Sequence, residues 1–322
     1  MPQHDQTKLP AFSELPVKEG APADSSWGVW GDDDGIGTLN LLTPEGVVEA
    51  AQLVQRGAVF RLDQPIGYAD PPLFNRSPFE HKVLKHRRFA NDDRLDAYNT
   101  QEGSQWDGLS HIGLDEQESY YNGVGEFEIG PDSPEHKLGI HLWANKVVGR
   151  GLLLDVFGLR QKQGNPLNPL EAEEYTVADF EAALAEQSST VTTGTILLVR
   201  TGWLQAYLGS STDDKAVMGD KGGLRSCGIE PTRQMAEWLW DNHVAAIALD
   251  CPAAETWPWD WERGPLHNRT LALLGLPLGE QFNLEEVAAD SAQDGRYEGM
   301  LVSAPLNLVG GIASPPNAVL IK

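Results

Sequence analysis

The stretch QEGSQWDGLSH, residues 101–111, combines a carboxylate, an imidazole and two carboxamides around a short turn. Asp107 follows the Gly103-Ser104 turn, and His111 lies four residues after Asp107. A carboxylate beside an imidazole can hold a metal ion or polarise a water molecule, and it can move protons. We therefore predict Asp107 and His111 as a catalytic pair. The alternative is a turn aspartate and a core histidine that are bonded only to backbone.

The two carboxamides, Gln101 and Gln105, lie at spacings where a metal site would carry histidines. Amide oxygens are hard, neutral ligands that suit Ca²⁺ or Mn²⁺ better than Zn²⁺. Three interpretations follow: weak ligands in a retained Mn²⁺ or Zn²⁺ site, groups that bind substrate without a metal, or members of a hydrogen-bond network. The residues leave these three open.

The stretch resembles the signature His-x-Gly-Thr-His-x-Asp-x-Pro-x-His of the cyclase family, which contains bacterial kynurenine formamidase and isatin hydrolase. Four positions match in kind: Gly103, Ser104, Asp107 and His111. Gln101 and Gln105 stand where the family has its first two metal-binding histidines, and Leu109 replaces the proline. The resemblance therefore supports the family's fold for this chain. The two glutamines leave open whether the chain binds the family's metal.

Later segments resemble the family in the same order along the chain, from about Trp27 to the C-terminus. They are GLLLDV at 151–156, GTILLVRTGW at 194–203, the strand 244–250 with Glu255 after it, His267, EQFNL at 280–284 and the closing segment 304–315. The resemblance implies that His267 and Glu280 complete a metal site with Asp107, with weak help from Gln105. It also implies that His111 acts as the general acid and base.

The pattern of apolar residues predicts one α/β domain at residues 27–322, after an N-terminal arm at residues 1–26. Buried strands are expected at 151–156, 195–200, 245–249 and 301–305, and helices at 43–55, 177–187, 232–242 and 284–289. Thr43 before Pro44 is a typical helix start. The family resemblance implies that the domain has the swivelling β/β/α architecture.

Three aromatic residues near the central stretch are candidates for substrate binding. Trp106 could stack on a flat substrate, and Tyr120 or Tyr121 could donate a hydrogen bond to an oxyanion. Core packing and a turn are the alternatives. Asp250 and Glu255 follow an apolar strand, where carboxylates often line a site, and a helix cap is the competing interpretation.

Composition restricts the classes of partner and compartment. The 322-residue chain has a net charge of −23, which argues against nucleic acid because phosphate binding needs lysine and arginine. We expect no nucleotide cofactor and no membrane span, since no apolar run approaches ~20 residues. The N-terminus lacks a signal pattern, and two cysteines give no zinc motif, so we expect a cytoplasmic protein with free thiols.

The expected activity is hydrolysis of an amide, lactam or lactone bond in a small aromatic or cyclic molecule, through a metal-bound or polarised water. The divalent metal would be Mn or Zn. The first alternative is a metal-free lyase, dehydratase or cyclase, and the second is an inactive homologue that only binds a small molecule. The resemblance implies a homo-oligomer, either a dimer or a tetramer.

Overall fold

The core of the molecule is a mixed nine-stranded sheet. The structure is a computed structural model that describes residues 9–322. In spatial order the strands are β1 (Val59–Arg61), β13 (Ala318–Ile321), β11 (Glu298–Ser303), β5 (Val148–Leu154), β7 (Thr195–Val199), β9 (Val244–Leu249), β10 (Leu278–Glu280), β4 (Gln105–Asp107) and β12 (Ala313–Ser314). The α/β prediction is confirmed.

The centre of the sheet is parallel, and its strands are apolar throughout. β5 pairs with β7, β7 with β9 and β9 with β10, all in the parallel sense. Every residue of β7 and β9 is buried, which is what a parallel sheet covered on both faces requires. Because these strands run the same way, their carboxyl ends meet at one edge, where β9 and β10 lead into Asp250 and Glu280.

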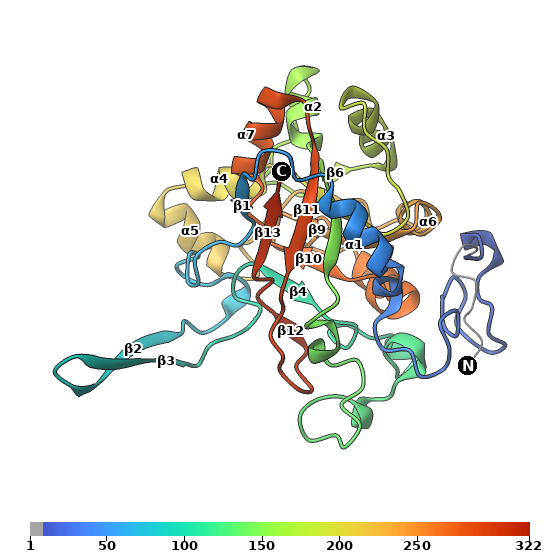
Figure 1. Cartoon of the computed structure of the whole chain (residues 1–322), viewed down its shortest axis with the longest axis horizontal. Helices are drawn as coiled ribbons and strands as arrows, with labels where there is room; N and C mark the ends of the chain where they lie inside the picture. Colours follow the sequence, from blue (N-terminus) through green and yellow to red (C-terminus); the bar gives the residue numbers. More distant parts are fainter. Residues whose placement is uncertain (1–8) are drawn as a thin grey trace.

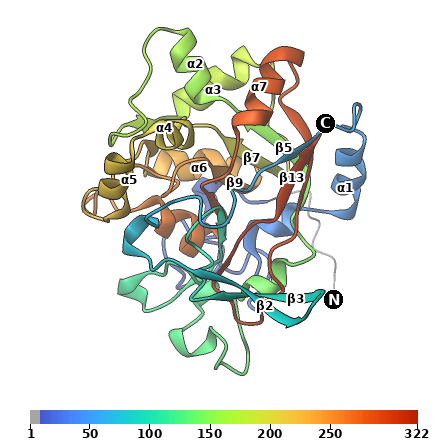
Figure 2. The same ribbon diagram turned by 90° about the vertical axis from the view of Figure 1, so that its left-hand side faces the viewer.

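Helices cover both faces of the sheet. They are α1 (Pro44–Ala51), α2 (Val156–Lys162), α3 (Val177–Glu186), α4 (Trp203–Gly209), α5 (Thr212–Gly219), α6 (Arg233–Asp241) and α7 (Glu285–Asp294). Helix α1 lies on one side of the sheet and most of the others gather on the opposite side (Figure 2). The predicted start at Thr43 is confirmed, because its side chain accepts a backbone N–H from the first turn, and the side chains of Thr176 and Thr232 do the same for α3 and α6.

Residues 9–26 contain one short 3₁₀ helix, Phe12–Glu14, and lie against α6. Phe12 is buried, and its backbone N–H donates to Asp241, while the indole N–H of Trp240 donates to the carbonyl of Pro10. Residues 1–8 of the predicted arm lie outside the described residues.

A hairpin extends away from the sheet on the opposite side from the N-terminal segment (Figure 1). It consists of β2 (Glu80–Arg87) and β3 (Ala90–Asp96), which pair only with each other. Two further short strands, β6 (Glu174–Tyr175) and β8 (Gly228–Ile229), form a separate parallel pair.

The described residues include both cysteines and all the helices that could be tested for a membrane span. Cys227 and Cys251 are both free and buried. No helix among residues 9–322 combines the length and the apolar character that crossing a membrane would need.

Candidate active site

The predicted catalytic stretch contains β4, which lies between β10 and β12 near one edge of the sheet. Gln105 is opposite Glu280 in the antiparallel register, and Asp107 is opposite Leu278. Since side chains alternate along a strand, Gln105 and Asp107 share one face and Trp106 occupies the other. The strand pairing thus brings Glu280, distant in sequence, beside the predicted stretch.

Trp106 belongs to the core. It is separate from the cluster of polar residues formed by Gln101, Gln105, Asp107, His111, His267 and Glu280. Its ring packs edge-on against Phe282, with centroids 5.0 Å apart, and its indole N–H donates to the hydroxyl of Ser303 at 3.0 Å. Only 1% of the residue is exposed. The structure therefore favours the packing interpretation of Trp106 over stacking on a substrate.

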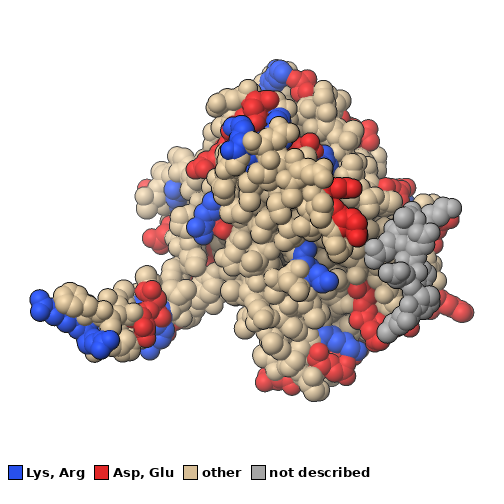
Figure 3. Space-filling model, in the orientation of Figure 1, with Lys and Arg blue, Asp and Glu red and all other residues tan. Residues whose placement is uncertain are grey.

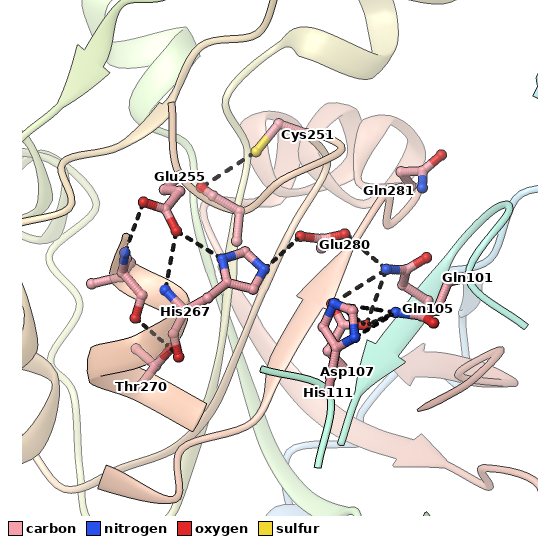
Figure 4. Close-up of polar contacts among 12 residues, drawn as sticks. Gln101, Gln105, Asp107, His111, Cys251, Glu255, His267, Thr270, Glu280 and Gln281 are labelled. Atoms are coloured by element: carbon pink, nitrogen blue, oxygen red, sulfur yellow. Dashed lines mark hydrogen bonds and ion pairs between the residues drawn. The ribbon is translucent and has the colours of Figure 1, made fainter. Parts of the chain in front are cut away.

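Both carboxamides turn their nitrogen atoms toward carboxylates (Figure 4). Gln105 Nε2 donates to Glu280 Oε2 at 2.8 Å and lies 3.2 Å from Asp107 Oδ1. Gln101 Nε2 donates to Asp107 Oδ1 at 2.8 Å and lies 3.1 Å from His111 Nδ1. In this arrangement the amide N–H groups face the carboxylates. They stand at the position where a bound cation would supply positive charge.

His267 lies on the other side of this cluster, between two carboxylates. Its Nδ1 is 2.7 Å from Glu255 Oε1, and its Nε2 is 3.3 Å from Glu280 Oε1. Burial acts to lower the pKa of His267, but the hydrogen bonds with Glu255 and Glu280 outweigh it and raise the pKa to about 10. Burial and repulsion from Asp107 raise the pKa of Glu280 to about 7.

Glu255 also fixes the backbone around His267. It accepts the backbone N–H groups of Leu266 and His267 at 2.7 and 3.0 Å, just before the π-helix Asn268–Leu274 begins. A carboxylate on the Nδ1 of a histidine leaves Nε2 free to point toward a ligand, which is common behind metal-binding imidazoles. Both interpretations of Glu255 describe the structure, because its carboxylate caps the start of this helix and also holds His267 beside the other polar residues.

His111 is more accessible than Asp107 and His267. Its side chain is 24% exposed, whereas those of Asp107 and His267 are 0% and 2% exposed. His111 Nε2 lies 3.9 Å from Asp107 Oδ1, and its ring centroid is 6.2 Å from that of His267. Burial lowers the pKa of His111, with attraction from Asp107 opposing this effect and the charge of His267 adding to it.

One buried group in the described part of the chain has the composition and spacing of a metal site. Ligand atoms of Asp107, His111 and His267 all lie within 4.8 Å of one another. Two imidazoles and a carboxylate suit Mn²⁺ or Zn²⁺, so these residues fit a divalent cation. The group differs from the predicted set of Asp107, His267, Glu280 and Gln105, because it includes His111. Gln105 presents its nitrogen, which cannot act as a ligand in this orientation.

The two predicted tyrosines make other contacts in the structure. The hydroxyl of Tyr121 donates to Asp34 at 3.0 Å, and the side chain is fully buried. Tyr120 is half-buried and lines a groove together with Phe127. Neither tyrosine hydroxyl is hydrogen-bonded to Asp107 or His111.

Two residues near the cluster carried no signal in the sequence. Arg76 donates from Nη1 to the carbonyl of Gln101, and burial lowers its pKa, with attraction from Glu280 and Asp107 opposing this. The ring of Trp259 lies 4.9 Å from the ring of His267. Both lie far from residues 101–111 in the chain, so spacing alone could not have identified them.

Comparison with known proteins agrees with this fold. Residues 48–256 match the family described as "Putative cyclase". A crystal structure described as a novel cyclase is 35% identical, covers 92% of this chain and 97% of its own, and superposes with a TM-score of 0.81. The chain therefore belongs to the cyclase family.

More distant structures share the fold. Isatin hydrolase A from Labrenzia aggregata is 14% identical over 82% of this chain and 94% of its own, with a TM-score of 0.56. A potential metal-dependent hydrolase with cyclase activity is 18% identical over 82% of this chain and 98% of its own, with a TM-score of 0.50. No curated protein matches the sequence.

Proposed function

We propose that this chain is a hydrolase that adds water to the carbonyl of an amide, lactam or lactone in a small cyclic or aromatic molecule. The observation that carries the proposal is the convergence of Asp107, His111 and His267 within 4.8 Å, in a chain of the cyclase family. Carboxylates and imidazoles at this spacing are the groups that activate water for attack on a carbonyl.

Asp107, His111 and His267 would hold a divalent cation, Mn²⁺ or Zn²⁺. Such a cation supplies Lewis-acid polarisation and lowers the pKa of water when it is bound. Glu255 holds the Nδ1 side of His267, so its Nε2 faces the cluster. Glu280 lies 3.3 Å from that nitrogen and is the nearest carboxylate that can accept a proton.

His111 has one of two roles, and the metal content of the protein decides between them. With a cation bound through its imidazole, His111 is a ligand and Glu280 is the proton acceptor. Otherwise His111, which is the accessible member of the cluster, takes the proton from water and returns it to the leaving group. Gln101 and Gln105 then orient the carboxylates or the substrate.

The test is elemental analysis of protein purified without chelator, for the wild type and for the variants D107A and H111A. We expect close to one Mn or Zn per chain in the wild type and its loss in both variants. Hydrolysis of N-formylanilines, isatin and aromatic lactones is then measured for the same proteins. Absence of metal from the wild type, even after incubation with Mn²⁺ or Zn²⁺, would exclude the metal-dependent reaction.

A second function is favoured by the orientation of the two carboxamides. Their N–H groups donate to Asp107 and Glu280, which stabilises these carboxylates without a cation. This supports a metal-free lyase, dehydratase or cyclase in which His111 moves the proton. Turnover of an activated substrate by a metal-free wild type, abolished in H111A, would establish this function. Tight binding of an aromatic acid without turnover would indicate an inactive homologue.

A further inference from the structure

The hairpin β2–β3 projects from the molecule as an arm with little support from the rest of the chain (Figures 1 and 3). Its two strands pair with each other through residues 80–96, and both outer edges are free of strand partners in the described structure. None of its side chains is buried. An isolated two-stranded hairpin is at best marginally stable in water, so this arm is expected to pack against something.

Large apolar side chains along the hairpin point to a protein contact. Phe89 at the tip is 85% exposed, Val83 is 57% exposed and Leu95 is 41% exposed. Unpaired strand edges that carry exposed apolar residues are templates for association. The hairpin therefore has the properties of a contact element, and the remaining question is which partner it fits.

The charge of the tip favours a second copy of this chain. Residues 85–88 read Lys-His-Arg-Arg and carry three positive charges with the histidine neutral. Residues 80–96 hold five Lys and Arg against four Asp and Glu, a sum of +1, so the rest of the −23 chain carries −24. Two basic tips would repel each other, whereas the acidic body of another copy would attract a tip.

One groove on the body has the matching chemistry. It has a volume of about 580 Å³ and is lined by Asp115, Glu118, Glu126, Tyr120 and Phe127, among others, with no lysine or arginine in its lining. Phe127 is 92% exposed, which makes it an apolar partner for an aromatic tip. Carboxylates around an aromatic side chain complement a tip that presents arginine beside Phe89.

We propose that the hairpin β2–β3 is an arm that binds a second copy of this chain, with its basic, aromatic tip in the acidic groove formed by residues 113–127. The inference concerns assembly and does not depend on the proposed reaction. The arm contributes no buried residue to the body, so its removal leaves the sheet and its core intact.

The first experiment measures the mass of the particle in solution by light scattering and sedimentation. The proteins are the wild type, a variant with residues 83–93 replaced by an Asn-Gly turn, and R87E/R88E. We expect a dimer or larger oligomer for the wild type and a smaller particle for both variants, with an unchanged melting temperature for the body. A monomeric wild type, or an oligomer unaffected by shortening the arm, would overturn the proposal.

The second experiment exchanges the charges. D115K/E118K/E126K is expected to weaken association at least tenfold. Mixing it with R87E/R88E is expected to restore association, because the acidic tip of one variant then meets the basic groove of the other. The matched control E49K/E181K/E262K changes net charge equally at exposed carboxylates outside the groove and should associate like the wild type. Equal weakening by the control would overturn the groove assignment. Binding of a DNA oligonucleotide that R87E/R88E abolishes would overturn the proposed partner.

Discussion

The side-chain amide of Gln105 lies between two carboxylates, with its nitrogen 2.8 Å from Glu280 and 3.2 Å from Asp107. Replacing Gln105 with histidine exchanges a donor for a borderline-soft ligand beside Asp107. We expect Q105H to bind Zn²⁺ or Mn²⁺ at least tenfold more tightly, which is about 1.4 kcal/mol. Competition with a chromogenic chelator measures the affinity. Q163H, on the exposed surface, is the control, and equal affinity of Q105H and the wild type would contradict the prediction.

Glu255 and His267 form a buried pair with 2.7 Å between Oε1 and Nδ1. Removing the charge in E255Q should lower the free energy of unfolding by ~3 kcal/mol, because an imidazolium is left with one carboxylate fewer. The raised pKa of His267 stabilises the fold fully below the unfolded value of 6.5, and this contribution disappears as the pH rises through about 10. The effect of E255Q should therefore be largest near pH 6 and decrease toward pH 10.

Urea unfolding in the presence of chelator, at several pH values, measures this effect. The exposed residue Glu181 provides the control E181Q, which should be neutral throughout. A loss of stability that is independent of pH would mean that the charge of His267 is not what Glu255 stabilises.

Local spacing indicated only the site residues that lie close together in the chain, whereas His267 and Glu280 were expected from the family resemblance alone. Asp107 and His111 are local, so their spacing indicated them directly. Glu280 reaches Gln105 through the pairing of β10 with β4, and no local pattern reports such a pairing. Trp106 was predicted as a binding residue because it lies inside the motif, but strand alternation turns it into the core.

Among the elements, β10 is tightly packed near the site. A Cβ atom on Gly279 would come within 2.6 Å of the Ala248 side chain and 2.9 Å of Trp106. We expect G279A to lower the free energy of unfolding by roughly 1–3 kcal/mol, the usual cost of overpacking a core. Denaturant unfolding measures the change. G209A, where nothing lies within 4 Å of an added Cβ, is the control and should not be destabilised.

The elements that sequence patterns predicted are those with strong local signals. The central strands are continuous apolar runs, and α1, α3 and α6 begin at threonine caps, so both kinds were placed within a few residues. In contrast, β3 contains Asp92, Asp93 and Arg94 and resembles a loop, because its strand structure depends on pairing with β2 and not on burial. β4 and β10 are three residues each, too short for a period to appear.

At the scale of the whole molecule, the net charge of −23 has opposite effects on folding and on assembly. Like charges repel within one chain, so raising NaCl from 10 to 200 mM should raise the melting temperature of the shortened-arm variant. The same salt should weaken the association of the wild type, because the arm binds by charge attraction. Calorimetry and sedimentation across this range measure the two trends. Association that strengthens with salt would show that attraction by the arm does not dominate, since salt also screens the repulsion between two chains of −23.

The exposed tip of the hairpin also determines how the molecule would be broken down. Its Lys-His-Arg-Arg sequence offers adjacent cleavage sites to trypsin-like proteases, and a projecting tip is where such enzymes cut first. A chain cut there would keep its core, because the hairpin buries none of its side chains. Free protomers would be cut quickly and assembled protomers slowly. The fraction of chains left uncut after a brief digestion would therefore measure the fraction that is assembled. Each cut would also be permanent, so a protomer nicked before it is assembled would remain folded but could no longer associate.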